Sequence, residues 1–280
     1  MLFVLLTAGP VAAGVGYALL YSLGLAGLLS RGFTFQHWLA VLGSGDFWLS
    51  VGFSAAVAAV TISLSVGLAL AAVVSWRNRL LSGPLSYAAY LPLAFPAVVV
   101  AFLIFQWLSS GGLAARLAWH LGLISDTTDF PGLINDQWGI GIIVAHVFMA
   151  TPFLTIFFVN LYQNEGVDQL RRVAASLGLS GRQLTTKLVA PLLINRARAT
   201  LLLYGIFVFS SYEIPLLLGS QSPSMITILT IRKLKRYNLG EIPQAYTISF
   251  FYALLLVAVL LLRAGWSLYR RTLKTAFDDR

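Results

Sequence analysis

The sequence predicts an all-α, polytopic membrane protein with six transmembrane helices, and three observations support this fold class. Of the 280 residues, 58% are hydrophobic and only 10% are charged. A soluble domain carries about 25% charged residues, so too few are present here to cover a surface that faces water. The charge-free runs reach the roughly 20 residues needed to cross about 30 Å of hydrocarbon. Backbone amides in lipid must be paired within their own element, which favours helices.

The charge-free runs follow one another along a single transmembrane domain, residues 1–280. The first run, residues 1–30, could also be a cleaved signal peptide. Its apolar stretch is longer than the usual 7–15 residues, however, and no Lys or Arg precedes it, so a span is favoured. The fifth run is interrupted by Glu213. We expect spans at residues 3–28, 48–74, 84–108, 138–161, 199–219 and 244–264.

The distribution of Lys and Arg predicts the orientation, because cytoplasmic loops are enriched in these residues. With the N-terminus inside, 13 of the 19 basic residues fall on inner segments, including six between Arg171 and Arg198. The outer segments hold Arg31, Arg116 and a cluster of four at residues 232–236, which locally opposes the trend. The sequence therefore predicts a multi-pass protein of the cell (inner) membrane, with residues 166–191 and the C-terminus in the cytoplasm.

The composition also narrows the chemistry of the chain. The net charge of +9 is explained by this topology and by contact with membrane lipid, so no nucleic acid partner is expected. The chain has no cysteine, which excludes disulfides and thiolate catalysis. No phosphate-binding G-x-x-x-x-G-K-[ST] loop and no H-E-x-x-H pattern is present. We therefore expect no catalytic residue, no metal and no cofactor, and any ATP that drives the protein must bind another chain.

Residues 166–191, which we call the elbow, are polar and basic between two apolar runs. Apolar residues recur there at spacings of three and four, which predicts an amphipathic helix; they are Val167, Leu170, Val173, Ala174 and Leu177. Gly178 follows, and glycine suits the left-handed residue that ends such a helix.

A second helix is predicted to begin directly after this bend. Ser180 and Gln183 have the serine-x-x-glutamine spacing of a capping box, and Leu179 and Leu184 have that of a hydrophobic staple. Pro191 is predicted to break or kink the chain as it enters the next span. The local pattern alone leaves two functions open, because amphipathic helices often lie at the membrane interface only as anchors.

The elbow resembles the "EAA…G…P" loop of permease subunits of type I ATP-binding-cassette (ABC) importers. Gly178 and Pro191 lie thirteen residues apart, as in that loop, while Arg172, Val173 and Ala174 stand where the family has Glu-Ala-Ala. Two further segments are similar to the group that transports polyamines, ferric iron, thiamine and molybdate. They are LPLAFPAVVVAF at residues 91–102 and YEIPLLLGSQ at residues 212–221.

This resemblance implies a MetI-like permease fold with a cytoplasmic coupling helix in the elbow. It implies two cytoplasmic ATP-binding subunits, a second permease subunit that is identical or related, and an extracytoplasmic solute-binding protein. It also implies that the elbow couples the permease to the ATPase. In this coupling, the apolar contacts would come from Leu170, Val173 and Leu177, and the polar contacts at the rim from Arg171, Arg172 and Arg182. The shape of the elbow would depend on Ala174, Gly178, Ser180 and Pro191.

Glu213 is the most informative residue within a span. A charge at mid-membrane costs about 2.5–3.5 kcal/mol on insertion scales, so such residues usually face a cavity or a partner. Glu213, with Tyr212 and Ser211, could belong to the path of a cationic or small polar solute. Alternatively, Glu213 is an interfacial residue hydrogen-bonded to a neighbour. It is also the best support for a rival class, an ion-gradient-driven secondary transporter.

An intramembrane enzyme is a third class, because "GLSG" at residues 178–181 matches the serine motif of rhomboid-type proteases. A serine nucleophile needs a nearby histidine base. All three histidines, His37, His120 and His146, precede Ser180, whereas the base in that family comes from a later helix. Capping accounts for Ser180, and His146 is expected to be a packed, neutral residue.

Overall fold

The computed structural model describes residues 2–27, 30, 32–81 and 84–278, and every regular element among them is a helix. Within these residues, five helices are long and apolar enough to cross a membrane. They are Gly45–Trp76, Ala97–His120, Ile140–Asn164, Gly181–Phe209 and Leu239–Gly265. The predicted all-α membrane fold is confirmed. Arg31, Arg280 and the end of the first predicted span at residue 28 lie outside the described residues.

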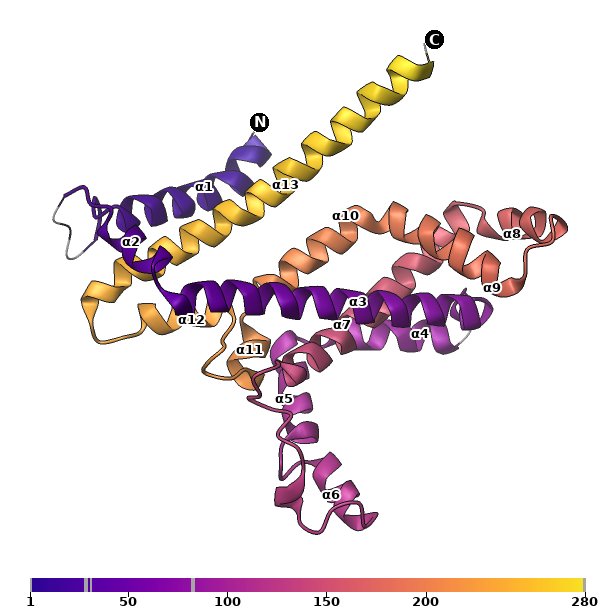
Figure 1. The fold of residues 1–280 in the computed structure, drawn as a ribbon, viewed down its shortest axis with the longest axis horizontal. Coiled ribbons are helices and arrows are strands. Elements are labelled where there is room, and N and C mark those ends of the chain that lie inside the picture. The colour runs from indigo at the N-terminus through magenta and orange to yellow at the C-terminus, as the bar shows by residue number, and fades with distance from the viewer. Residues whose placement is uncertain (1, 28–29, 31, 82–83, 279–280) are drawn as a thin grey trace. The chain divides into compact units, whose positions relative to one another are not determined.

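The chain forms two units, and the larger one comprises Ser50–Met225. α8 and α9 lie at one end of this unit, and α6 extends away from its other helices (Figure 1). Its helices, with α3 beginning just before the unit, are α3 (Gly45–Leu81), α4 (Pro84–Tyr90), η1 (Leu91–Ala94), α5 (Ala97–Leu108), α6 (Leu113–His120), η2 (Thr127–Asp129), α7 (Ile140–Asn164), α8 (Val167–Ser176), α9 (Gly181–Gln183), η3 (Leu184–Val189), α10 (Ala190–Phe209) and α11 (Glu213–Leu218).

Small polar residues are buried along one face of α3. Ser50, Ser54, Thr61 and Ser65 are all buried there at spacings of four and seven. Small side chains let backbones approach in membrane bundles, where burial of apolar surface gives little preference for one arrangement. Further along, α3, α7, α8, η3 and α10 share one core, made of Ala69, Val73, Leu154, Phe158, Val159, Tyr162, Val167, Val189, Leu193 and Ala197.

The third predicted span, residues 84–108, is not one continuous helix. α4 and η1 end at Ala94, Phe95 is extended at ψ 129°, and α5 begins only after Pro96. A residue before proline is pushed toward extended backbone, and proline has no N–H to continue the helical bonds. The apolar helical stretch therefore runs from Ala97 to His120 instead, with an irregular segment between α5 and α6.

The fifth predicted span, residues 199–219, also differs from the helix in the structure, which runs from Gly181 to Phe209. The start of this helix agrees with the helix predicted directly after the bend, and it continues into the apolar run without a break. Long Arg and Lys side chains can sit on a helix that enters the membrane, because their stems pack on apolar surface while their charges reach water. Residues 210–212 then interrupt the helix before α11.

The smaller unit comprises residues 1–49 and 226–280. It contains α1 (Leu2–Ser22), α2 (Gln36–Leu42), α12 (Ile226–Leu234), η4 (Leu239–Glu241) and α13 (Ile242–Asp278). α1 lies along α13 (Figure 1), and the rings of Tyr21 and Tyr246 stack between them at 4.2 Å. Gly27 has φ +107°, and a Cβ there would lie 2.3 Å from the Tyr21 ring, so only glycine fits.

Candidate functional site: the elbow and the helix break

The elbow begins where α7 ends. Gly166, at φ +58°, turns the chain from α7 into α8. Val167, the first residue of α8, is fully buried in the core shared by α3, α7 and α10. The Tyr162 hydroxyl donates a 2.9 Å hydrogen bond to Asp168 Oδ1, and Arg171 Nη1 donates one of 3.4 Å back to the Tyr162 oxygen. α8 is therefore fixed to the bundle at its first turns by apolar and polar contacts.

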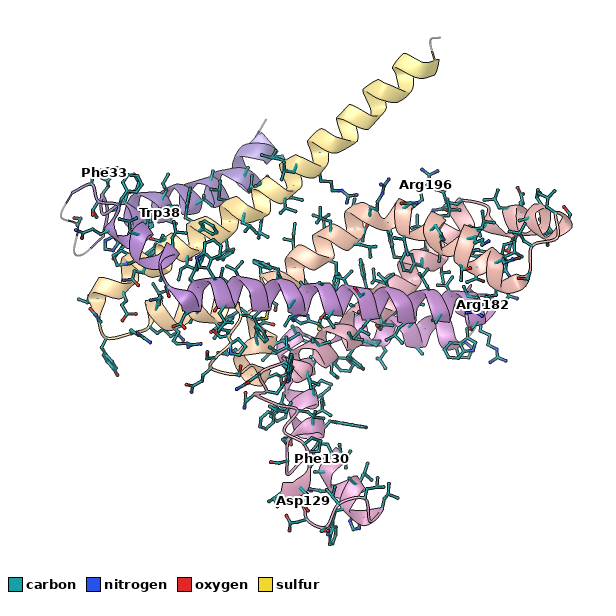
Figure 2. The ribbon with its side chains drawn as sticks, viewed as in Figure 1. Phe33, Trp38, Asp129, Phe130, Arg182 and Arg196 are labelled. Carbon is teal, nitrogen blue, oxygen red and sulfur yellow. The ribbon has the colours of Figure 1, made fainter. Side chains whose placement is uncertain are left out.

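An ion pair on the same end of the unit joins α7 to α10. Arg196 Nε lies 2.9 Å from Glu165 Oε1, between the end of α7 and the body of α10. Figure 2 labels Arg196 on α10 and Arg182 within the elbow. Because the Arg196 side chain is more than half exposed, the pair itself contributes little energy, about 0–1 kcal/mol.

The bend at Gly178 has the backbone pattern of a Schellman motif. Gly178 has φ +86°, its N–H donates to the Ala175 carbonyl at 3.0 Å, and the Leu179 N–H donates to the Ala174 carbonyl at 3.2 Å. The predicted left-handed end of the helix is confirmed. These two bonds pair carbonyls that the end of α8 would otherwise leave free.

The predicted capping box is also confirmed. The Gln183 N–H donates to Ser180 Oγ at 3.4 Å, and the Ser180 N–H donates to Gln183 Oε1 at 3.0 Å. Leu184 is buried and Leu179 is half-buried beside the bend. Ser180 is thus engaged in starting a helix, which is the role that the sequence favoured over catalysis.

Pro191 lies within a continuous helical stretch and does not break it. The turn just before it, Leu184–Val189, is a π-helix, and α10 follows directly. Because Pro191 has no N–H, the Lys187 carbonyl lacks its usual α-helical donor, and a wider turn accommodates that loss. Helix thus continues without interruption from Gly181 to Phe209.

One face of α8 exposes large apolar side chains. Leu170 is 42% exposed, Val173 61% and Leu177 76%. Arg172 and Arg182 are also exposed, whereas Ala174 is half-buried and Arg171 is half-buried against Tyr162. The structure therefore brings the predicted apolar contacts together on one surface, with Arg172 on the same helix and Arg182 just beyond the bend.

The second group of predicted residues lies at the break between α10 and α11. Ser211 Oγ lies 3.0 Å from His146 Nε2 of α7 and donates to Met225 Sδ at 3.9 Å. Tyr212 is half-buried at the N-terminal cap of α11. Glu213 is exposed in the first turn of α11, where the helix dipole favours a negative charge. Within the part of the chain that the structure describes, no hydrogen bond to the Glu213 carboxylate is found.

His146, which the sequence predicts to be packed, is buried, but its contact with Ser211 was not predicted. It is 1% exposed, and within the described residues its Nδ1 has no hydrogen-bond partner. Its partner Ser211 is 65 residues away, so nothing local in the sequence indicates the contact. The one available signal is that a histidine inside a span is costly unless it has a partner.

Two aspartates in the segment between α6 and α7, Asp126 and Asp136, have hydrogen-bond partners. Asp136 accepts hydrogen bonds from the N–H groups of Trp138 and Ile140 at the start of α7. The Thr128 backbone N–H, 2.8 Å from Asp126 Oδ1, lowers the pKa of the Asp126 carboxyl. Among the described residues, no group of three or more His, Asp or Glu side chains is placed to hold a metal ion.

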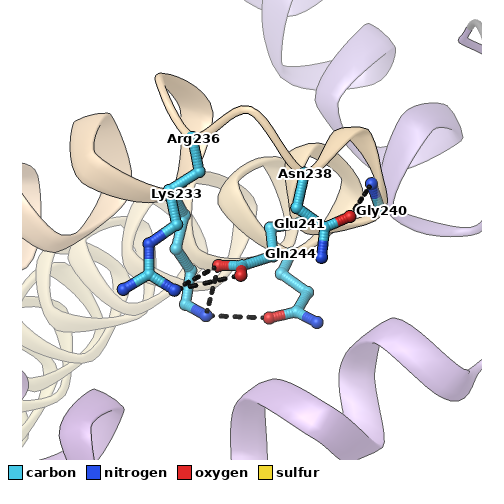
Figure 3. A network of polar contacts seen from close by, with 6 residues as sticks. All are labelled: Lys233, Arg236, Asn238, Gly240, Glu241 and Gln244. Carbon is cyan, nitrogen blue, oxygen red and sulfur yellow. Dashed lines mark hydrogen bonds and ion pairs between the residues drawn. The ribbon is translucent and has the colours of Figure 1, made fainter.

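The basic run at residues 232–236 is partly neutralised within the smaller unit. Lys233 Nζ donates to Gln244 Oε1 at 2.8 Å and lies 3.6 Å from Glu241 Oε2 (Figure 3). Arg236 Nη1 lies 3.0 Å from Glu241 Oε1. These contacts join α12 and the residues after it to η4 and the first turn of α13.

Comparisons with known proteins show the family and the fold of the chain. Residues 63–269 match the family described as "Binding-protein-dependent transport system inner membrane component". A crystal structure of a bacterial alginate ABC transporter, in complex with an alginate pentasaccharide-bound periplasmic protein, contains a similar chain. It is 16% identical, with a TM-score of 0.65 over 93% of this chain and 88% of that chain. No curated protein matches the sequence.

A second similar structure is a bacterial ABC transporter involved in the import of the acidic polysaccharide alginate. The match has 17% identity and a TM-score of 0.65, over 95% of this chain and 91% of that one. At these identities the two structures show the fold alone, and that fold is the one of type I ABC importer permeases. The chain belongs to the family of binding-protein-dependent transport system inner membrane components. It is thus a multi-pass transmembrane subunit of an ABC importer.

Proposed function

We propose that the chain forms half of the translocation path of an ATP-driven importer and that its elbow docks on a separate cytoplasmic ATPase. The observation that carries the proposal is the exposed apolar face of Leu170, Val173 and Leu177 on a helix whose base is fixed to the bundle. An exposed apolar patch with a polar border is typical of a protein interaction site. Membership of the family supports a second permease subunit and two ATPase subunits.

The charged residues of the elbow indicate the charge of the ATPase groove that would receive it. Asp168 and Glu165, the acidic groups at the base, are bonded to Tyr162 and Arg196. Arg172 and Arg182 remain exposed beside the apolar face. The facing rim of the ATPase groove therefore carries acidic residues, because complementary potentials suppress wrong partners and set the register. A periplasmic solute-binding protein is the proposed outer partner, as in the alginate complex.

An ion-gradient-driven secondary transporter is the rival. Such carriers use discontinuous helices with sites near the midplane, and the break at residues 210–212 is such a discontinuity. The test is uptake of labelled polyamine, thiamine, ferric ion and molybdate by cells that carry the whole transporter. We expect uptake to disappear when the Walker lysine of the ATPase is replaced while ion gradients are intact. Uptake that survives this change and stops with an ionophore would overturn the proposal.

For the cargo, we propose a small polar solute, with a cation favoured over an anion. Glu213 is exposed at the break, and a carboxylate on the path would repel an acidic solute such as the alginate of the similar transporters.

Glu213→Gln keeps the size of the side chain and removes its charge. We expect the rate of cation uptake to fall about tenfold, which corresponds to about 1.4 kcal/mol, with unchanged amounts of protein in the membrane. Glu241→Gln is the control, since Glu241 is an acidic residue that is bonded to Lys233 and Arg236. Unchanged uptake by the Glu213 variant would leave this residue as an interfacial one.

A further inference from the structure

We propose that His146 and Ser211 are positioning residues that form a latch across the helix break, and that opening this latch frees Tyr212 and Glu213. The role of the latch in transport rests on the proposed function. The geometry of the latch stands on its own, because one hydrogen bond of 3.0 Å joins His146, in the second turn of α7, to the non-helical segment between α10 and α11.

The two adjacent serines at the break differ in a way that isolates this contact. Ser210 Oγ donates to the Ile206 carbonyl at 2.8 Å, within its own helix. Ser211 Oγ instead reaches another helix at His146 Nε2 and also contacts Met225. A hydroxyl that bonds back to its own helix cannot fix the break relative to α7, whereas one that bonds across can.

The surroundings of His146 argue against a role in packing alone. The ring is 1% exposed and lies edge-on to Phe207, with ring centroids 6.5 Å apart. Its Nδ1 is buried without a hydrogen-bond partner in the described chain. An unpaired buried polar atom is unfavourable, and an apolar side chain of similar size would avoid it. The feature that an apolar residue could not supply is the bond to Ser211.

The break is a place where the backbone can move. Non-helical backbone at membrane depth occurs where it is buried in protein or lines a water-filled cavity. The C-terminal end of α11 is held by the Asn135 N–H, which donates to the Leu218 carbonyl at 2.9 Å. The break itself, at Ser211, is held to α7 by the latch. Hydrogen bonds between membrane helices are individually modest, so a bond of this kind can open and re-form in each cycle.

The absence of cysteine makes a direct test available. A cysteine at position 212, introduced as Tyr212→Cys, reports access to the break in the full chain in lipid nanodiscs. The probe is the rate of labelling by fluorescein maleimide. We expect Ser211→Ala and His146→Phe each to raise this rate at least fivefold. Ser210→Ala, the matched control, should change it less than twofold, and Ser211→Thr, which keeps the hydroxyl, should restore it.

Combining Ser211→Ala with His146→Phe should give no further increase, because both remove the same bond. An unchanged rate in Ser211→Ala, or equal increases in Ser210→Ala and Ser211→Ala, would overturn the latch. A cysteine at exposed position 173, from Val173→Cys, checks folding, since its labelling rate should be the same in all variants. Labelling needs no ATPase or cargo. If labelling shows the latch but the cells have no ATP-dependent uptake, the proposed function is refuted and the latch is still supported.

Discussion

Replacing Gly178 with aspartate is expected to leave the chain inserted in the membrane and to uncouple ATP hydrolysis from solute uptake. Gly178 has φ +86°, and a Cβ there would meet nothing within 4 Å, so the cost is conformational and not steric. Aspartate tolerates the left-handed region better than most residues, so the cost is at the lower end of the usual range, about 1 kcal/mol, which shifts a conformational equilibrium roughly fivefold. The measurement is uptake per ATP hydrolysed by the reconstituted transporter, which should fall by about that factor.

Gly181→Asp is the matched control for this prediction. Gly181 lies three residues further along, also has open space at its Cβ, and begins α9 without a positive φ. Aspartate is favourable in the first turn of a helix, so this variant should transport normally. If Gly178→Asp also moved solute with normal coupling, the elbow would be a membrane anchor and not a coupling element.

Replacing Val173 with aspartate is expected to separate the permease from its ATPase. Val173 is 61% exposed at the centre of the apolar face, so the change leaves the core of the chain intact. Anchor residues at the centre of an interface typically contribute about 2 kcal/mol or more. The amount of ATPase that co-purifies in mild detergent should therefore fall more than tenfold, while the permease remains in the membrane fraction.

Ala175→Asp tests whether the apolar face, and not charge in general, is responsible. Ala175 is exposed on the same helix but two positions on, about 200° around the axis at 3.6 residues per turn. It should retain the ATPase. Equal losses in both variants would attribute the effect to added negative charge, and crosslinks from positions 170–182 that reach only phospholipid would exclude docking.

The local features of the elbow could be predicted because their signals lie within a few residues of one another. The left-handed end at Gly178 and the capping box of Ser180 and Gln183 depend on hydrogen bonds between residues three to five positions apart. The positions of the helix ends in the membrane were harder to predict. Charge-free length placed a boundary near residue 199, whereas helix continues back to Gly181. Charge marks where side chains meet water and not where hydrogen bonding along the backbone stops.

Contacts between distant segments could not be predicted from one sequence. The bond from His146 to Ser211 spans 65 residues, and the core that holds Val167 draws on α3, α7, η3 and α10. Which faces of apolar helices meet depends on shape, because almost every position is hydrophobic. The sequence therefore indicated Ser211, Tyr212 and Glu213 as residues of interest but gave no distant partner, such as His146, for any of them.

The uninterrupted stretch from Gly181 to Phe209 has a mechanical consequence. Its 29 residues, at about 1.5 Å each, make a rod about 43 Å long. A tilt of about 10° about one tip would displace the other by roughly 7 Å over that length. With the proposed docking of the elbow on an ATPase, we therefore expect a small rotation at the docked end to produce a large displacement at the other end. The π-helical turn before Pro191 lies within that rod, and we expect bending at this turn to reduce the displacement that is transmitted.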